Sequence, residues 1–237
     1  GGYYPTYSNN NAIDNRGVEI TLSHDNRVGD FEYGARLTLS WARAKYVKYA
    51  DAYGTPSYQR VTGSIVNTDL LLVAEGLFQT EEEIDASPWY GGRRPQLGDI
   101  KYKDIDGDGI IDAWKDRTYS GRNNRPELTG GLNLYAAWKG IDVSLMFTGA
   151  ALFDVALTGE YGRNVGMDST PFTDPFKADA NAPVYLVEGS WTPENPNAEY
   201  PRLSVNRSTG GDNSLASTFW YRDGKYIRLK TAQIGYT

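Results

Sequence analysis

Cysteine is absent from this 237-residue sequence, and histidine is represented only by His24. The missing thiols exclude disulfides and thiolate metal sites, and a single histidine disfavours a histidine-based active site. A net charge of −6 with scattered basic residues disfavours a nucleic-acid partner. No apolar run approaches the roughly 20 residues of a membrane helix. Neither an initiator methionine nor a signal peptide opens the chain, so we expect a piece of a longer protein.

Glycine and tyrosine, in contrast, are abundant, with 26 and 18 residues. This balance favours turns and β-structure and leaves little material for long helices. The clearest local exception is residues 80–85, where Thr80 precedes three glutamates and Glu83 stands three positions later. That spacing predicts a short helical turn with a capping box.

The first predicted hairpin joins residues 17–24 to residues 31–41 through a turn at 25–30. In its second strand, one face is apolar: Phe31, Tyr33, Ala35, Leu37, Leu39 and Trp41. Eleven alternating residues with aromatics at both ends match the roughly 9–11 residues of a strand that crosses a bilayer. A long strand of a soluble sheet with one face on a core fits this hairpin equally well.

A second hairpin is predicted over residues 128–137 and 141–148, with its turn at 138–140. One face of each strand is apolar and the other is mostly small or polar, which is typical of a wall between lipid and a wet lumen. Two such hairpins favour a transmembrane β-barrel. A last strand is expected within 223–237, where the apolar phase changes and predicts a bulge or a membrane boundary near Lys230.

Residues 151–218 show no clear strand pattern and are rich in Asn, Asp, Pro and Gly. In a barrel such a segment is expected as a long extracellular loop, because one set of loops is long and the other short. Three loop aromatics, Trp89, Tyr161 and Trp191, are weak candidates for stacking on a substrate such as a sugar. Packing inside the loops themselves is the more ordinary role of such rings.

An acidic loop within residues 98–121 has the spacing of a calcium site. Residues 98–103 before it alternate as in a strand, and residues 117–126 after it are expected to form turns. The five ligands that its positions one, three, five, seven and nine would offer are Asp104, Asp106, Asp108, Ile110 (through its carbonyl) and Asp112. Gly109 stands at position six, where such a loop turns sharply, but position twelve is Lys115 instead of a bidentate acid. The loop is therefore predicted either to hold a structural Ca²⁺ or to be an Asp/Gly turn that binds nothing.

Several segments together resemble a known family. They occur in the family's order; each is a weak signature by itself, and the set is specific. The six segments are 15–22 (NRGVEITL), 75–80 (EGLFQT), 98–112 (GDIKYKDIDGDGIID), 191–197 (WTPENPN), 201–203 (PRL) and 225–230 (KYIRLK). This set is similar to the later part of SusC/RagA-type TonB-linked outer-membrane transporters. The likeness spans essentially the whole chain.

The resemblance implies an all-β fold: residues 1–237 would be part of a large antiparallel transmembrane β-barrel, 22-stranded in the family, with long extracellular loops. It implies a location in the outer membrane of a Gram-negative, Bacteroidetes-like cell. Implied partners are a SusD-like surface lipoprotein, TonB, the lipid bilayer and an imported oligosaccharide or peptide. No catalysis is implied.

Two other functions were weighed from the residues. A secreted, calcium-stabilised β-sandwich that binds carbohydrate would explain the acidic loop and the aromatic content, but not two long apolar-faced hairpins. A glycoside hydrolase would need paired carboxylates, such as Asp154 with Glu160 or Glu194 with Glu199. Ordinary solvated acids explain these better, and no nucleophile-elbow, zinc-protease or phosphate-loop pattern is present. We therefore expect no enzyme.

Overall fold

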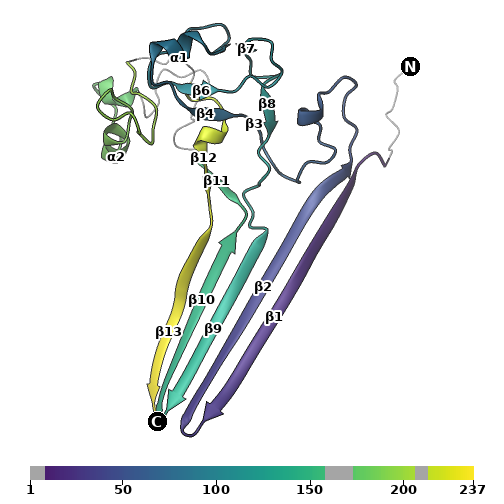
Figure 1. The fold of residues 1–237 in the computed structure, drawn as a ribbon, viewed down its shortest axis with the longest axis vertical. Helices are drawn as coiled ribbons and strands as arrows, with labels where there is room; N and C mark the ends of the chain where they lie inside the picture. Colours follow the sequence, from purple (N-terminus) through teal and green to yellow (C-terminus); the bar gives the residue numbers. More distant parts are fainter. Residues whose placement is uncertain (1–8, 158–172, 206–212) are drawn as a thin grey trace. The chain divides into compact units, whose positions relative to one another are not determined.

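A computed structural model describes residues 9–157, 173–205 and 213–237 (Figure 1). The chain forms two compact units. Unit 1 comprises Gly1–Thr68, Gly121–Val155 and Asp223–Thr237, and unit 2 comprises Asp69–Ser120 and Ala156–Arg222. The long alternating segments fall in unit 1, and the acidic loop falls in unit 2.

Unit 1 is built on one five-stranded sheet in which every neighbouring pair is antiparallel. Its strands, in spatial order, are β1 (Ala12–Val28), β2 (Phe31–Lys48), β9 (Leu128–Trp138), β10 (Ile141–Ala151) and β13 (Tyr226–Tyr236). The all-β, antiparallel fold class predicted from the sequence is confirmed.

The first hairpin is longer than its side-chain pattern predicted. The turn predicted at 25–30 is wrong in extent: β1 continues to Val28, and only Gly29 and Asp30 form the turn. At the other end, Ala12 pairs with Lys48, well beyond the alternating segment. These extra pairs are held through backbone groups and carry polar side chains, so hydrophobic alternation could not reveal them. The second hairpin turns at Lys139 and Gly140, as predicted, with positive φ at both residues.

The change of phase in the last strand is a β-bulge, as one of the two sequence alternatives predicted. Met146 of β10 pairs with Thr231 of β13, whereas the next residue, Phe147, pairs with Leu229. Lys230 is therefore the extra residue. Because one inserted residue reverses the alternation of a strand, the bulge brings the earlier part of β13 into phase with the later part.

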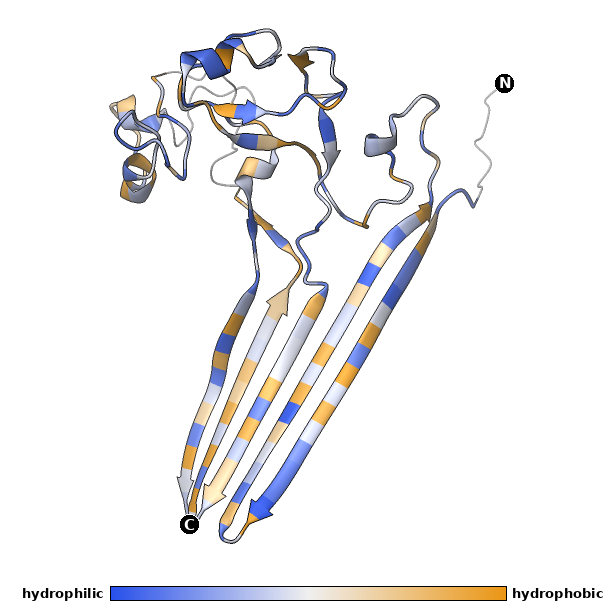
Figure 2. Ribbon diagram, viewed as in Figure 1, coloured by the Kyte–Doolittle hydropathy of each residue, from blue (hydrophilic) through white to orange (hydrophobic). Residues whose placement is uncertain are grey.

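The five-stranded sheet contains almost no buried residues. Along its strands, only Ala150 is buried, and most other side chains are exposed or half-buried. Figure 2 shows apolar and polar residues alternating along β1 and β2. Among the described residues, neither helix is long and apolar enough to span a membrane.

Unit 2 has a conventional core made from short elements. The buried apolar cluster consists of Leu72, Ile100, Tyr102, Ile111, Leu186, Tyr200 and Trp220. Three strand pairs contribute to this unit: β3 (Leu70–Leu72) with β8 (Arg117–Tyr119), β4 (Ala74–Leu77) with β6 (Ile100–Tyr102), and β5 (Trp89–Tyr90) with β7 (Ile110–Ile111). Residues 117–126 were predicted to be turns, and β8 corrects that for the first three, because their pairing partner lies about fifty residues away.

Seven further short elements complete the described chain: the helices α1 (Glu81–Asp85) and α2 (Val184–Glu188), the strands β11 (Asp154–Ala156) and β12 (Tyr221–Asp223), and the 3-10 turns η1 (Ser57–Gln59), η2 (Asp174–Phe176) and η3 (Thr218–Trp220). Of these, η1 belongs to unit 1. Helix α1 has the predicted capping box. The amide of Glu83 donates to Thr80 Oγ1 at 3.1 Å, and the Glu83 carboxylate accepts from the amide of Gln79 at 2.9 Å. The hydrogen bond from Gln79 lowers the pKa of Glu83, and Lys101 beside it acts in the same direction.

Candidate functional site

One face of the five-stranded sheet is apolar from edge to edge. The cross-strand register aligns Ile20 with Leu39, and Leu37 with Leu132. The same face continues over β10 and β13, with Phe147 opposite Leu229. Its exposed side chains include Val18, Ile20, Leu22, Phe31, Trp138, Ile141, Ile227, Leu229, Ile234 and Tyr236. A continuous apolar surface of this kind is unusual in contact with water and marks an interaction with another apolar phase or protein.

Aromatic side chains border the apolar face near the two tight turns. The register places Phe31 opposite Trp138, Trp138 opposite Ile141, and Ile141 opposite Tyr236. Trp41 stands on the same face, ten positions after Phe31 along β2. Aromatic girdles at the edges of an apolar band are typical of strands that cross a bilayer, because these rings favour the interface with water.

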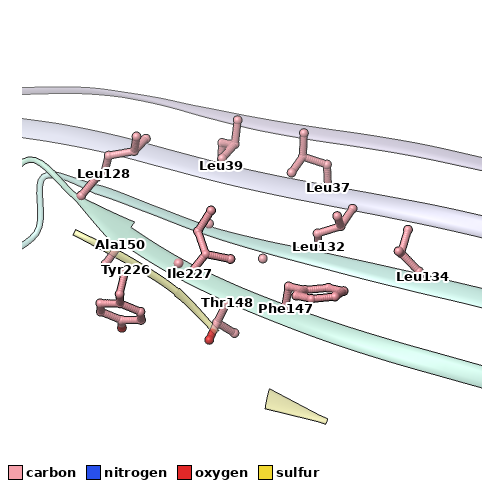
Figure 3. Close-up of a pocket in the computed structure, with 14 residues that line it drawn as sticks. Leu37, Leu39, Leu128, Leu132, Leu134, Phe147, Thr148, Ala150, Tyr226 and Ile227 are labelled. Carbon is pink, nitrogen blue, oxygen red and sulfur yellow. The ribbon is translucent and has the colours of Figure 1, made fainter. Parts of the chain in front are cut away.

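A hollow of about 530 Å³ lies in the middle of the apolar face. Leucines of β2 and β9 surround it together with Phe147 and Ile227 (Figure 3). Gly130 and Gly149 pair with each other at this place, and their missing side chains leave the depression. A Cβ atom on Gly130 would lie 2.8 Å from Leu39 Cδ2, so a larger residue there would require the Leu39 side chain to shift.

The opposite face of the sheet is polar and is joined by hydrogen bonds between neighbouring strands. Ser144 Oγ donates to Gln233 Oε1 at 3.2 Å. Thr38 Oγ1 donates to the carbonyl of Gly131, and Ser40 Oγ donates to Glu19 Oε1, both at 3.4 Å. The sheet therefore has one apolar face and one polar face.

The acidic loop in unit 2 has a tightly curled backbone. Carboxylate oxygens of Asp104, Asp106 and Asp108 lie within 4.8 Å of one another. Asp104 accepts hydrogen bonds from the amides of Gly107 and Gly109, at 2.6 and 2.9 Å. Asp112 lies at the far end of the loop and accepts from the amides of Trp114 and Lys115, each at 2.6 Å. The calcium site at Asp104, Asp106, Asp108, Ile110 and Asp112 stays a prediction.

Lys115 extends its side chain back into this group of acids. Its Nζ lies 2.7 Å from Asp108 Oδ2 and 3.9 Å from an oxygen of both Asp106 and Asp112. The hydrogen bond between Lys115 and Asp108 raises the pKa of the lysine and lowers that of the aspartate. Hydrogen bonds from the Lys115 and Trp114 amides lower the pKa of Asp112.

Comparison with known proteins gives two curated relatives, both from Formosa agariphila. TonB-dependent receptor P26 is 28% identical over 250 residues, which cover 99% of this chain and 23% of the relative. TonB-dependent receptor P39 is 27% identical over 145 residues, covering 59% of this chain and 12% of the relative. No family model matches the chain.

The chain is similar to these two TonB-dependent receptors. The resemblance drawn from its motifs is thereby confirmed. Among solved structures, the RagAB peptide transporter matches 99% of this chain and 24% of its own, with a TM-score of 0.60 at 17% identity. The RagAB peptide importer in its closed-closed state gives a TM-score of 0.59 at 16% identity, with the same coverage. These structures support the fold, and the chain spans about a quarter of their length.

The three candidate substrate-binding aromatics have different surroundings. Trp191 is buried, donates from Nε1 to Gln79 Oε1 at 3.0 Å, and covers the backbone of Gly98. Trp89 is half-buried and donates to the carbonyl of Ile84 at 2.8 Å. Tyr161 lies outside the described residues. Both described rings thus have packing roles, and a contact with substrate stays a prediction.

Sequence reasoning missed the polar centre of unit 2, which is Asp99. This fully buried carboxylate accepts hydrogen bonds from Arg202 Nε at 2.8 Å, Asn213 Nδ2 at 2.9 Å and the amide of Gln96 at 2.8 Å. It therefore ties together segments more than a hundred residues apart in the chain. The only signal in the sequence was the Gly98–Asp99 pair at the start of the strand predicted over residues 98–103, and this pair does not reveal the partners of Asp99.

Proposed function

We propose that this TonB-dependent receptor segment forms part of the wall and of the extracellular rim of an outer-membrane transporter. The five-stranded sheet is the wall, with its apolar face toward lipid and its polar face toward the lumen. The residues of unit 2 belong to the two long connections of the chain, between β2 and β9 and between β10 and β13, and long connections are typical of extracellular loops. The segment is assigned no catalytic role, in keeping with relatives named as receptors.

The single observation that carries this proposal is the absence of a core beneath the sheet. Among the described strand residues of this sheet only Ala150 is buried, although more than ten large apolar residues on one face are exposed. Apolar burial is the main driving force of folding, so such strands need another apolar phase. A bilayer supplies that phase, and the aromatic residues near the turns would lie at the interface between the bilayer and water.

The alternative, a secreted carbohydrate-binding β-sandwich, needs a second sheet against the apolar face. In the part of the chain that the structure describes, each of the other sheets has two strands. Strands of 17 and 18 residues are also far longer than the usual strands of about 5–6 residues in soluble sheets. Both observations favour the membrane wall.

The cargo and partners belong to the same proposal. The polar face suits a hydrophilic solute, which we take to be an oligosaccharide or a peptide. The name of the RagAB peptide transporter supports the peptide class for that protein. Import would use TonB for energy and a SusD-like lipoprotein at the surface, as the motif resemblance implies.

The test uses the absence of cysteine in this chain, which allows single reporters to be placed on either face. Leu37→Cys reports on the apolar face and Thr38→Cys on the polar face, one position along the same strand. Each is introduced into the full-length protein on a cysteine-free background, labelled with a fluorophore and reconstituted in vesicles. Brominated lipid should quench the label at position 37 and spare that at 38, and aqueous iodide should do the reverse.

Membrane fractionation with a heat-modifiability gel provides the second readout. A closed barrel migrates differently before and after boiling and stays in the outer-membrane fraction. A soluble protein without such a shift, or labels that respond alike to both quenchers, would overturn the wall assignment.

A further inference from the structure

The acidic loop lacks the two carboxylate oxygens that a calcium site takes from position twelve. A calcium loop of this spacing places a bidentate carboxylate there. This chain has Lys115 at that position, and its ammonium lies among Asp106, Asp108 and Asp112 at 2.7–3.9 Å. A divalent cation on these carboxylates would meet a like charge, so the residues do not fit a calcium ion as they stand.

The backbone holds the lysine in place. The amide of Lys115 donates to Asp112 Oδ1 at 2.6 Å, which fixes the start of its side chain beside the loop. The next residue, Asp116, is fully buried and accepts from the amides of Ile105 at 2.7 Å and Asp112 at 2.8 Å. The carboxylate of Asp116 thus connects the two ends of the loop by hydrogen bonds to their backbone amides. In a calcium loop, the bound ion would make this connection.

The charges of the loop are also balanced in part by this one residue. Asp104, Asp106, Asp108 and Asp112 carry four negative charges on a short curved segment, and such like charges repel one another. Lys115 is the cation in salt-bridge contact with three of the four. Its ammonium is more than half exposed, so the contact can form without burying an ion.

We propose that Lys115 replaces the calcium ion of an EF-hand-like loop, so that residues 104–116 fold without divalent metal. The structure of the loop then does not depend on the calcium concentration around it. This inference stands independently of the proposed transport function, because it concerns only the folding of the loop.

The test measures backbone hydrogen exchange of residues 104–116 in the full-length protein in detergent, with EDTA and with millimolar Ca²⁺. In the wild type we expect the same protection in both solutions, within about two-fold. Lys115→Glu restores an acid at position twelve and removes the internal cation. We expect its loop to lose at least ten-fold protection in EDTA and to regain it with Ca²⁺.

Two further variants make the result specific. Lys115→Gln removes the ammonium without adding a carboxylate, so its loop should lose protection in EDTA and recover less than that of Lys115→Glu in Ca²⁺. Lys103→Glu makes the same change of charge at an exposed position outside the loop and should behave as the wild type. A wild-type loop whose protection rises ten-fold with Ca²⁺, or a Lys115→Glu loop that is insensitive to both solutions, would overturn the proposal.

Discussion

Phe147 of β10 lies opposite Leu229 of β13, whereas the preceding residue of β10, Met146, lies opposite Thr231, two positions further along β13. This relationship places Ile227 and Leu229 on the same face as Ile234. If β13 paired with β10 as a regular strand that kept all its residues, its early part would present Ile227 and Leu229 to the polar face. The bulge at Lys230 therefore completes the apolar surface at that edge of the sheet.

Deletion of Lys230 should leave assembly intact. It removes only the extra residue, so the residues on either side of it join into one regular strand and Ile227 and Leu229 keep their places on the apolar face. Leu229→Arg instead brings a charge to that face, where it costs up to about 2–4 kcal/mol at the bilayer centre, and should reduce assembly strongly. The heat-shifted, folded fraction in outer membranes is the measurement, and equal losses in both variants would contradict the argument.

A charge on the apolar face should be far more costly than the same charge beside it. Leu132→Arg, near the middle of β9, is expected to lose about 2–4 kcal/mol of folding free energy, and Asn133→Arg on the polar face should be nearly neutral. Urea unfolding in lipid vesicles, followed by gel shift, compares the two. Similar losses for both would mean that this face does not contact lipid.

Removal of the charge of Asp99 should loosen unit 2. Asp99→Asn leaves the largely buried guanidinium of Arg202 without that carboxylate, which typically costs about 3–5 kcal/mol. Hydrogen exchange at the amides of residues 98–100 should accelerate at least about a hundred-fold. Arg94→Ala breaks exposed ion pairs with Glu81 and Asp85 and should leave this exchange nearly unchanged. An Asp99→Asn protein with unchanged exchange would refute the role of this residue.

Helix α1 should weaken in acid because of Glu83. The hydrogen bond from the Gln79 amide and the nearby Lys101 lower the pKa of Glu83 below its ordinary value of 4.5. Its stabilising contribution is therefore fully present above that ordinary pKa and is lost as pH falls through the lowered folded value. Exchange at the amides of Gln79 and Ile84 between pH 3 and 6 should reveal this loss.

The matched variants for this helix separate charge from capping. Glu83→Gln removes the titrating group, so the acid-dependent part of the exchange should disappear. Thr80→Ala removes the hydroxyl that caps Glu83 and should cost about 1 kcal/mol at every pH in this range. The same pH profile in Glu83→Gln as in the wild type would assign the effect to another group.

The parts of the fold that the sequence predicted are those specified by neighbouring residues. Alternation predicted two hairpins and the change of phase at Lys230, and the Thr80–Glu83 spacing predicted the cap of α1, because each is a relation between residues close in the chain. The predicted turn at 25–30 and the predicted turns at 117–119 were wrong. In both places backbone pairing with a distant or polar partner decided the structure, and side-chain pattern does not record it.

What the sequence by itself determined is the identity of the two faces of the sheet, the acid spacing of the loop and the relationship to TonB-dependent receptors. Only the tertiary structure decided that β2 pairs with β9, that Asp99 joins Arg202 and Asn213, and that Trp191 covers Gly98. It also placed the ammonium of Lys115 among the acids, although position twelve was already known to lack a carboxylate. The physical reason is that periodicity fixes the direction of a side chain relative to its own strand, whereas its partner depends on how distant segments of the chain fold together.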